Sequence, residues 1–449
     1  MKVIVGGAGE VGFNIAEKLS REKIDVVLVD SDRERLGEVV DSLDVQTVCG
    51  SLSHPITLRE AGLDKADLLV AVTGSDESNI LACRLAQLLS PETRRAARVR
   101  DSLLYRSLTE EGVHEGLGLS FIIDPISLTV DTIIDFLALP GVGDVIDVSG
   151  GRLKFIGQRL HRQHPAVGRT LAESLPRVEG SVLLVVAVHR GHEVIIPTGR
   201  TVLKARDLVY LAVTSEHLDE AGRFFGLEWR PVKNVFVMGG GEVGLALAKR
   251  LEERDMTVKL IERSAERCEF LSRELNGAIV IKGDATDQFV LEDEGVSECD
   301  VFIAVGTDDE KNMVSCLLAR RLGAANTITR VNRYSYAPLV SAIGLESLVS
   351  ARVAAVSAIL KHVKKGLAVT VATLRNEGAE VVEVEVPEGS KLAGKALMAS
   401  KFPADAIVAA VVRGERAVIP RGETIIEAGD VLMIVARAEA IPLLEKAVD

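Results

Sequence analysis

The chain has 449 residues, of which 47% are hydrophobic, 26% charged and 4% aromatic, and its formal net charge is −12. This length predicts roughly three or four domains, and the negative charge argues against a general nucleic-acid binder and against adhesion to anionic lipid. The small aromatic content argues against a base-stacking surface, and no apolar stretch approaches the ~18 residues that span a bilayer.

The cysteines and the start of the chain predict a cytoplasmic protein. The sequence has five cysteines, an odd number, with no C-x-x-C pair among them. We expect small, buried, reduced thiols. The first apolar run begins at the N-terminus, so no signal peptide is expected. Any membrane association would run through a protein partner.

The first expected strand, KVIVG, opens into the glycine pattern G-x-G-x-x-G. Gly7 permits a tight turn, Gly9 lets the backbone approach a pyrophosphate, and Gly12 lets the following helix pack closely on the strand. A second strand ends in Asp30. Its carboxylate can accept hydrogen bonds from ribose hydroxyls and would repel a 2′-phosphate, which favours NAD over NADP. A tight turn without a ligand is the alternative.

Further strands complete the first unit. The fourth ends at Thr73 and Gly74, which could line the adenosine or the second ribose at the rim of the same crevice. The fifth carries Arg98, which could neutralise phosphate charge or could pair with Asp101 or a partner subunit. Helical stretches with apolar residues at three- and four-residue spacing separate the strands, as in a doubly wound parallel sheet.

A smaller module follows this unit. Asp124-Pro125 marks a break, and a helix is expected over about 126–139. The segment after it is rich in strands, with Pro197-x-Gly199 and Arg206-Asp207 as turns and a short helix at its end. These features predict a small α+β module.

The second half repeats the first. NVFVMGGGEVG repeats the glycine loop at an offset of 239 − 7 = 232, and Glu262 matches Asp30 at the same offset. Arg330 matches Arg98, again 232 residues apart. The expected helix at about 350–365 and a second strand-rich module follow, in which Pro420, Gly422 and Asp430 match Pro197, Gly199 and Asp207, each 223 residues apart. A repeat of this extent indicates a duplicated nucleotide-binding unit.

The predicted fold is therefore α/β, with two Rossmann-like doubly wound parallel-sheet domains, each followed by a small α+β domain. The expected boundaries are 1–124, 143–227, 231–349 and 366–449. The two apolar helices between the modules have too little neighbouring chain to cover them, which predicts a homo-oligomer.

Two loop acids have an open interpretation. Glu10 and Glu242 occupy the variable position inside each glycine loop. A carboxylate there would lie near any third phosphate, which favours a dinucleotide over ATP. A solvated loop acid is the alternative.

No catalytic constellation is found, so no enzymatic activity is expected. Four histidines gather in the first small module, but the second has no counterpart, which predicts a solvated surface cluster: His161, His164, His189 and His192. Asp308, Asp309 and Glu310 predict an exposed loop, with a divalent-cation site as the alternative.

The order of modules, with GAGEVG, LVD and VTGSDE followed by PTG and RD, resembles tandem regulator-of-potassium-conductance (RCK) domains, as in the peripheral cytoplasmic nucleotide-binding subunit of Trk potassium uptake systems. The resemblance covers nearly the whole chain. It implies NAD(H) and, in several members, ATP or ADP as ligands. It also implies a ring, expected to be a homo-tetramer, beneath a membrane-embedded Trk- or Ktr-type potassium transporter subunit.

The site residues are carried over by motif. The resemblance implies a first site of Gly7, Ala8, Gly9, Glu10, Val11, Gly12, Asp30, Thr73, Gly74 and Arg98, and a second of Gly239, Gly240, Gly241, Glu242, Val243, Gly244, Glu262 and Gly306. One departure bears on their equivalence. Arg100 of the first half becomes Asn332 in the second, so the two sites are expected to differ in affinity or ligand.

These features favour a regulator that binds nucleotide without catalysis and gates a potassium transporter, with the helices at about 126–139 and 350–365 as hinges. A soluble NAD-dependent oxidoreductase, or a nucleotide sensor for another ion transporter, are the alternatives. A proton-relay residue beside the crevice would distinguish the oxidoreductase, and none is found.

Overall fold

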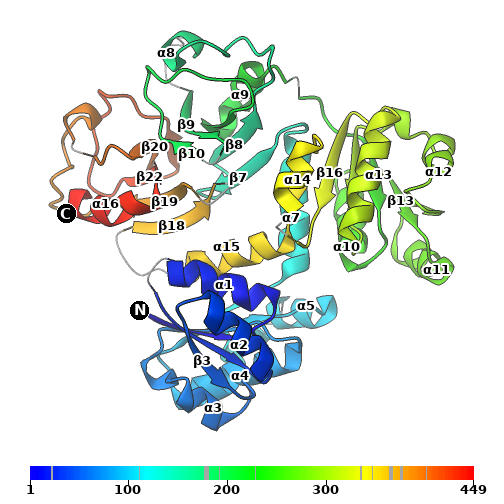
Figure 1. Ribbon diagram of the computed structural model, residues 1–449, viewed down its shortest axis with the longest axis horizontal. Helices are drawn as coiled ribbons and strands as arrows, with labels where there is room; N and C mark the ends of the chain where they lie inside the picture. Colours follow the sequence, from blue (N-terminus) through cyan, green and yellow to red (C-terminus); the bar gives the residue numbers. More distant parts are fainter. Residues whose placement is uncertain are drawn as a thin grey trace. The chain divides into compact units, whose positions relative to one another are not determined.

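The computed structural model describes residues 1–448 except 22–23, 111, 176–181, 192, 228, 334–335, 346, 364–367, 375–377 and 401. His192 and residue 366, the expected start of the last domain, lie outside the described residues. The chain forms two compact units, Met1–Thr129 with Ser350–Val363 and Val130–Val349 with Lys364–Asp449 (Figure 1).

The first unit is built on a parallel six-stranded sheet in the order β3-β2-β1-β4-β5-β6. The strands are β1 (Lys2–Gly6), β2 (Asp25–Asp30), β3 (Gln46–Cys49), β4 (Leu68–Ala71), β5 (Arg94–Arg98) and β6 (Phe121–Ile123). The helices are α1 (Glu10–Arg21), α2 (Arg33–Ser42), α3 (Pro55–Glu60), α4 (Asp76–Leu89), α5 (Ser102–Glu110), α6 (Val113–Gly116) and the start of α7 (Pro125–Ala138). The strand order reverses between β1 and β4, which is where such sheets bind ligands.

Helices cover both faces of this sheet, and one comes from the far end of the sequence. Successive residues of β1 alternate between two cores, with Val3 in one and Ile4 in the other. The core that holds Val3 also contains Ala355 and Ile359 of α15 (Ala351–Val363), both fully buried. Helix α15 packs against α1 and β6 (Figure 1). The helix that follows the second parallel sheet in sequence therefore completes the first.

The second unit contains the matching parallel sheet, in the order β14-β13-β12-β15-β16-β17. Its strands are β12 (Asn234–Met238), β13 (Thr257–Glu262), β14 (Ile279–Lys282), β15 (Val301–Ala304), β16 (Asn326–Arg330) and β17 (Ser347–Val349). Its helices are α10 (Glu242–Glu252), α11 (Ala265–Glu274), α12 (Gln288–Asp293), α13 (Asp309–Arg321) and α14 (Ala337–Ala342). Asp131 on α7 pairs with Arg250 on α10 at 3.0 Å, so α7 contacts the second parallel domain.

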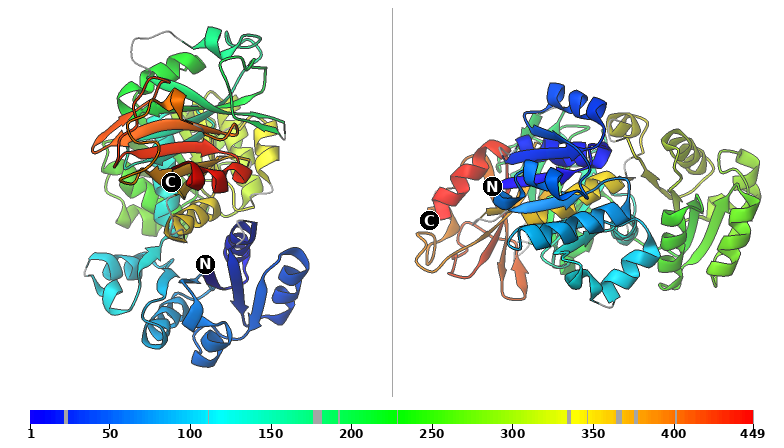
Figure 2. Two further views of the ribbon diagram at one scale, coloured as in Figure 1. Left: turned by 90° about the vertical axis from the view of Figure 1, so that its left-hand side faces the viewer. Right: turned by 90° about the horizontal axis from the view of Figure 1, so that it is seen from below.

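Two antiparallel five-stranded sheets complete this unit, in the orders β10-β9-β11-β8-β7 and β18-β19-β22-β20-β21 (Figure 2). The first has β7 (Asp144–Val148), β8 (Leu153–Arg159), β9 (Leu183–Arg190), β10 (Glu193–Ile195) and β11 (Leu208–Thr214), with α8 (Leu171–Ser174) and α9 (Leu218–Phe225). The second has β18 (Ala368–Thr373), β19 (Glu380–Glu385), β20 (Ala406–Arg413), β21 (Arg416–Val418) and β22 (Val431–Ala436), with α16 (Ile441–Val448). Side chains of both sheets form one core, in which Phe155 and Tyr210 pack with Val381 and Met433.

The expected turns of the small domains carry a matched ion pair. Arg206 and Gly429 have φ of 71° and 84°, as tight turns require. The buried Asp207 that follows accepts from Arg190 at 2.7 and 2.9 Å, and Asp430 accepts from Arg413 at 2.7 and 2.8 Å. The aspartate of each Arg-Asp or Gly-Asp turn therefore ties the turn to the neighbouring strand.

The predicted fold class is confirmed, because two parallel Rossmann-like sheets are each followed by a small α+β domain. The expectation that the connecting helices lack cover within the chain is wrong. Ile133 and Phe136 of α7 are buried at 0% and 2% exposure, as is Ile359 of α15 at 0%. For α15 the cover comes from the core of the first parallel domain, which is distant in sequence, a pairing that local patterns do not encode.

Candidate nucleotide-binding sites

The two glycine loops have the same geometry. Gly7 and Gly239 have φ of 109° and 107°, a region that favours glycine. A Cβ on Gly12 would lie 1.7 Å from the carbonyl oxygen of Gly7, and one on Gly244 would lie 1.9 Å from that of Gly239. The first and last glycine of each loop are therefore required by the chain's own backbone.

The middle glycine of each loop has a different environment. A Cβ on Gly9 or Gly241 would meet no heavy atom within 4 Å. The protein itself does not need glycine there, and the open space leaves the backbone accessible to a ligand. The residue before the middle glycine faces the protein interior in both loops. Ala8 is 8% exposed, and a Cβ added to the matched Gly240 would lie 2.4 Å from Leu271.

Val11 and Val243 pack towards the protein interior. Val11 lies against the core beneath α1, and Val243 is 6% exposed. The side chains of these two expected site residues therefore belong to the protein interior.

The acids that end β2 and β13 hold the glycine loops. Asp30 accepts from the N–H of Ala8 at 2.6 Å and of Asp32 at 2.9 Å. Glu262 accepts from the N–H of Gly240 and of Ser264, both at 2.8 Å. Each carboxylate thus joins the loop to the strand end where an adenosine ribose would lie, and its remaining lone pairs can accept from ribose hydroxyls.

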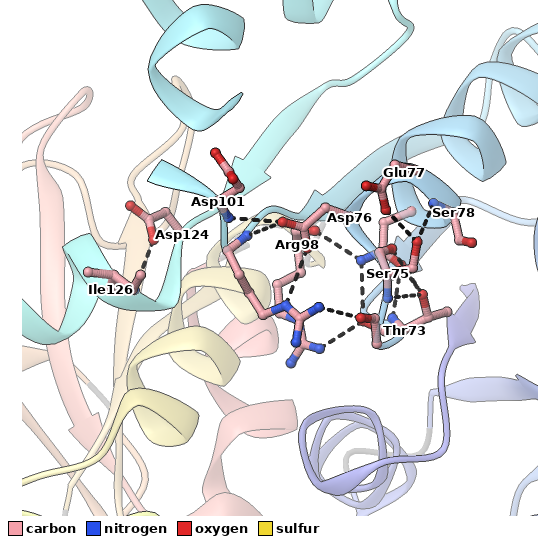
Figure 3. A network of polar contacts seen from close by, with 12 residues as sticks. Thr73, Ser75, Asp76, Glu77, Ser78, Arg98, Asp101, Asp124 and Ile126 are labelled. Carbon is pink, nitrogen blue, oxygen red and sulfur yellow. Dashed lines mark hydrogen bonds and ion pairs between the residues drawn. The ribbon is translucent and has the colours of Figure 1, made fainter. Parts of the chain in front are cut away.

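A second network lies at the end of β4 (Figure 3). Asn79 accepts from the N–H and hydroxyl of Thr73 at 2.9 and 2.7 Å, and its amide donates to the carbonyl of Arg98 at 2.9 Å. The guanidinium of Arg98 donates to the carbonyl of Thr73 at 2.7 Å. This is the contact that the structure describes for Arg98, rather than the ion pair with Asp101 that the sequence left open. Gly74 accepts from the side chain of Arg100.

Asp76, which the sequence did not single out, organises this rim. It accepts from the N–H of Arg100 at 2.8 Å and of Asp101 at 2.9 Å, and it pairs with the Arg100 guanidinium at 3.3 Å. Burial alone would raise the pKa of Asp76, but the two backbone donors and the Arg100 side chain lower it. Asp76 is therefore held as a carboxylate beneath the crevice.

The second half repeats part of this network. Gly306 stands at the position of Thr73, and Asn312 Oδ1 is buried with no hydrogen-bond partner among the described residues. Asn312 donates to the carbonyls of Gly306 and Arg330 at 2.9 and 3.0 Å. Asp309 accepts from the N–H and the amide of Asn332 at 2.9 and 3.0 Å. Asn332 therefore keeps the contact that Arg100 makes to its aspartate, but it brings no positive charge. The repeat could have revealed these residues in the sequence. Asp76 and Asp309 are 233 residues apart, and so are Asn79 and Asn312.

Arg98 and Arg330 each bury an Nε with no hydrogen-bond partner among the described residues. Burial lowers the pKa of both guanidinium groups. A buried, unpaired donor is costly, and a phosphate oxygen would satisfy it.

A further arginine, Arg352 of α15, is close enough to the first glycine loop for the charge of Glu10 to act on it. The Nε of Arg352 is buried and has no partner among the described residues. Burial lowers the pKa of Arg352, and the negative charges of Glu10 and Glu17 on α1 oppose this shift. The loop acid Glu10 therefore interacts with a cation from the other half of the sequence.

Three expectations outside the loops need correction. His189 is buried, at 3% exposure, and is no part of a solvated cluster. Asp309 is buried at the first turn of α13, so the acids after β15 do not form an exposed loop. The described residues contain no group of three metal-ligating side chains. Cys49 is exposed, although buried thiols were expected.

The thiols of Cys83, Cys299 and Cys316 are buried, as expected, and burial raises the pKa of each to about 12. Within the described residues, no helix combines the length and apolar character needed to cross a membrane.

Two family models match the chain twice each. The TrkA-N domain matches residues 3–117 and 235–351, and the TrkA-C domain matches residues 159–226 and 381–449. The chain belongs to the TrkA family. This TrkA-family chain is 35% identical over 438 residues to the Trk system potassium uptake protein TrkA of Halomonas elongata, covering 96% of this chain and 94% of the relative.

A second relative and two solved structures are also similar to this chain. Trk system potassium uptake protein TrkA homolog 1 of Methanosarcina mazei is 34% identical over 453 residues, covering 99% of both chains. The crystal structure of the GsuK RCK domain matches with a TM-score of 0.60 at 21% identity, covering 100% of this chain and 94% of that one. A GsuK channel bound to NAD matches with a TM-score of 0.59 at 22% identity, covering 100% and 78%. These structures support the RCK fold.

Proposed function

We propose that this TrkA-family chain is the nucleotide-binding regulatory subunit of a Trk-type potassium uptake system. The observation that carries the proposal is the duplicated loop whose middle glycine, Gly9 or Gly241, faces open space while the adjacent acid holds the loop. Relatives of matching length are named potassium uptake proteins, and a GsuK channel of the same fold is described as bound to NAD.

The ligand is an adenine nucleotide, with NAD(H) favoured and ATP or ADP as the alternative. In each site the loop N–H groups would hold the pyrophosphate at the start of α1 or α10. Asp30 or Glu262 would bind the ribose, and Arg98 or Arg330 would supply positive charge at the rim. Thr73, Gly74 and Gly306 would line the crevice with their backbone.

Signalling would run through α7 and α15. The boundary between the two compact units falls inside α7, after Thr129, and again at both ends of α15. Because these helices carry the chain from one unit to the other, a nucleotide that favours one arrangement of the units would shift the conformational equilibrium through them.

The regulatory subunit would act from the cytoplasmic face of the membrane as a homo-oligomer, expected to be a tetramer, bound to a membrane-embedded Trk- or Ktr-type subunit. Leu81 and Leu88 on α4 and Leu103 on α5 are 48%, 65% and 73% exposed. Exposed leucines on two consecutive helices of one domain suit a contact between copies of the chain.

The test is potassium uptake in a deletion strain at low external potassium. We expect uptake to fall, and we expect Asp30→Ala or Glu262→Ala to alter its response to nucleotide while the chain stays with the membrane fraction. Unchanged uptake in the deletion strain, together with steady hydride transfer from NADH by the purified chain, would instead support the oxidoreductase alternative.

A further inference from the structure

The acid inside the second glycine loop has a cation partner from its own domain. Arg267 on α11 donates from Nη2 to Glu242 at 2.9 Å and from Nε to the carbonyl of Gly240 at 2.6 Å. The guanidinium also lies over the ring of Phe270, with 4.6 Å to the centroid. Arg267 is therefore fixed against the loop that would receive a pyrophosphate.

The matched arginine of the first half is directed elsewhere. Arg35, which lies 232 residues before Arg267, pairs with Asp32 at 3.3 Å and has a side chain that is 59% exposed, against 27% for Arg267. The cation that acts on Glu10 is Arg352, held in the packing of α15 against α1. Arg267 thus donates a hydrogen bond to Glu242, whereas Arg352 acts on Glu10 through its charge.

Two substitutions explain the difference. The residue that caps the helix is Asp32 in the first half and Ser264 in the second, and both accept the backbone N–H groups of the first turn. Asp32 can also bind the guanidinium of Arg35, whereas the hydroxyl of Ser264 carries no charge. One turn later the first half has Glu38, whose carboxylate can also attract Arg35. The second half has Phe270 at the matched position, whose ring face can hold Arg267.

We propose that Arg267 is a specificity-determining residue that raises the affinity of the second site for nucleotides ending in a free phosphate, such as ADP, relative to its affinity for a dinucleotide. This inference rests on the proposed nucleotide binding. A terminal phosphate carries more negative charge than the diphosphate bridge of NADH. A guanidinium has five N–H donors, and Arg267 uses two of them on Gly240 and Glu242, so it can hold the loop and a phosphate oxygen together.

In the first site the matched Arg35 pairs with Asp32 instead of the glycine loop, so this site should bind ADP less well relative to NADH. The preference is therefore measured as the ratio of the ADP and NADH dissociation constants, and this ratio should differ between the two sites of one chain. Either site can be isolated in the full chain by Gly9→Val, which blocks the first loop, or Gly241→Val, which blocks the second.

The experiment measures ADP and NADH binding by calorimetry in the Gly9→Val chain. Arg267→Gln should weaken ADP binding about tenfold, as expected for a lost charge-assisted hydrogen bond, and NADH binding by less than threefold. In the Gly241→Val chain, the matched control Arg35→Gln should leave the ADP-to-NADH ratio unchanged.

A charge swap tests the same idea without removing Arg267. Ser264→Asp with Phe270→Glu should turn Arg267 outwards and reproduce the loss of ADP affinity. The reverse pair in the first half, Asp32→Ser with Glu38→Phe, should increase ADP affinity in the Gly241→Val chain. Circular dichroism would establish that each variant is folded.

The outcomes separate the two proposals. If the Gly9→Val chain binds nucleotide but Arg267→Gln and the charge swap leave the ratio unchanged, the inference about Arg267 is wrong and nucleotide binding stands. If neither nucleotide binds the second site at all, both the inference and the proposed function of that site are wrong.

Discussion

Substitution of the first-loop glycines should separate ligand binding from folding. Gly9→Val adds a side chain where no heavy atom lies within 4 Å, so we expect the free energy of unfolding to change by less than about 1 kcal/mol. Gly12→Ala places a Cβ 1.7 Å from the carbonyl oxygen of Gly7, a backbone atom that cannot move cheaply. We expect that change to cost about 3 kcal/mol or more.

Nucleotide binding should follow the opposite order. The valine at position 9 would stand between the loop N–H groups and a pyrophosphate. Loss of two charge-assisted hydrogen bonds, at about 1.5–3 kcal/mol each, would weaken binding at the first site by at least a hundredfold. The stoichiometry measured by calorimetry should then fall from two nucleotides per chain to one, and Gly9→Val with Gly241→Val should abolish binding.

The assay pairs calorimetry with urea unfolding on the same preparations. Full stoichiometry in the double valine variant would show that the glycine loops do not hold the ligand. A Gly12→Ala chain as stable as the parent would show that the close approach of α1 to the loop is not present in solution. Gly244→Ala, whose Cβ would lie 1.9 Å from the carbonyl oxygen of Gly239, gives the matched measurement in the second half.

Other outcomes are expected from the same structure. NAD or NADH should bind more tightly than NADP, because Asp30 and Glu262 oppose a 2′-phosphate; calorimetry with equal affinities would contradict this. Burial, aided by the charge of Arg159, lowers the pKa of His189 to about 4, below its usual 6.5. Between pH 6.5 and 4 the unfolded chain is therefore protonated at His189 while the folded chain is not. The free energy of unfolding should fall by up to about 3 kcal/mol as the pH drops through this range, and His189 should not change it above pH 6.5. His189→Val, which copies the buried Val412 at the matched position, should remove this dependence and raise the melting temperature at pH 5; an unchanged pH profile would refute the assignment. Light scattering should give a mass above the 48.1 kDa of one chain, and a monomer at every concentration would refute the proposed assembly.

The sequence by itself determined the repeated architecture and the loops. Glycine spacing, the acid at the end of the second strand and the apolar runs are local signals, because a tight turn or a buried strand constrains only a few neighbouring residues. The same reasoning located Gly9 and Gly241. It overlooked Asp76, since an aspartate near the start of a helix is a common sequence feature, and its role depends on two N–H groups that follow β5.

The tertiary structure decided which side chains meet across long separations. The apolar pattern of α15 predicts a helix, but only packing assigns that helix to the first parallel sheet and brings Arg352 towards Glu10. His189 reads as a surface histidine in sequence and is buried because β9 lies within an antiparallel sheet. Arg35 and Arg267 occupy the same place in the repeat, yet their partners differ, because a guanidinium pairs with whichever carboxylate or ring the surrounding fold brings within reach.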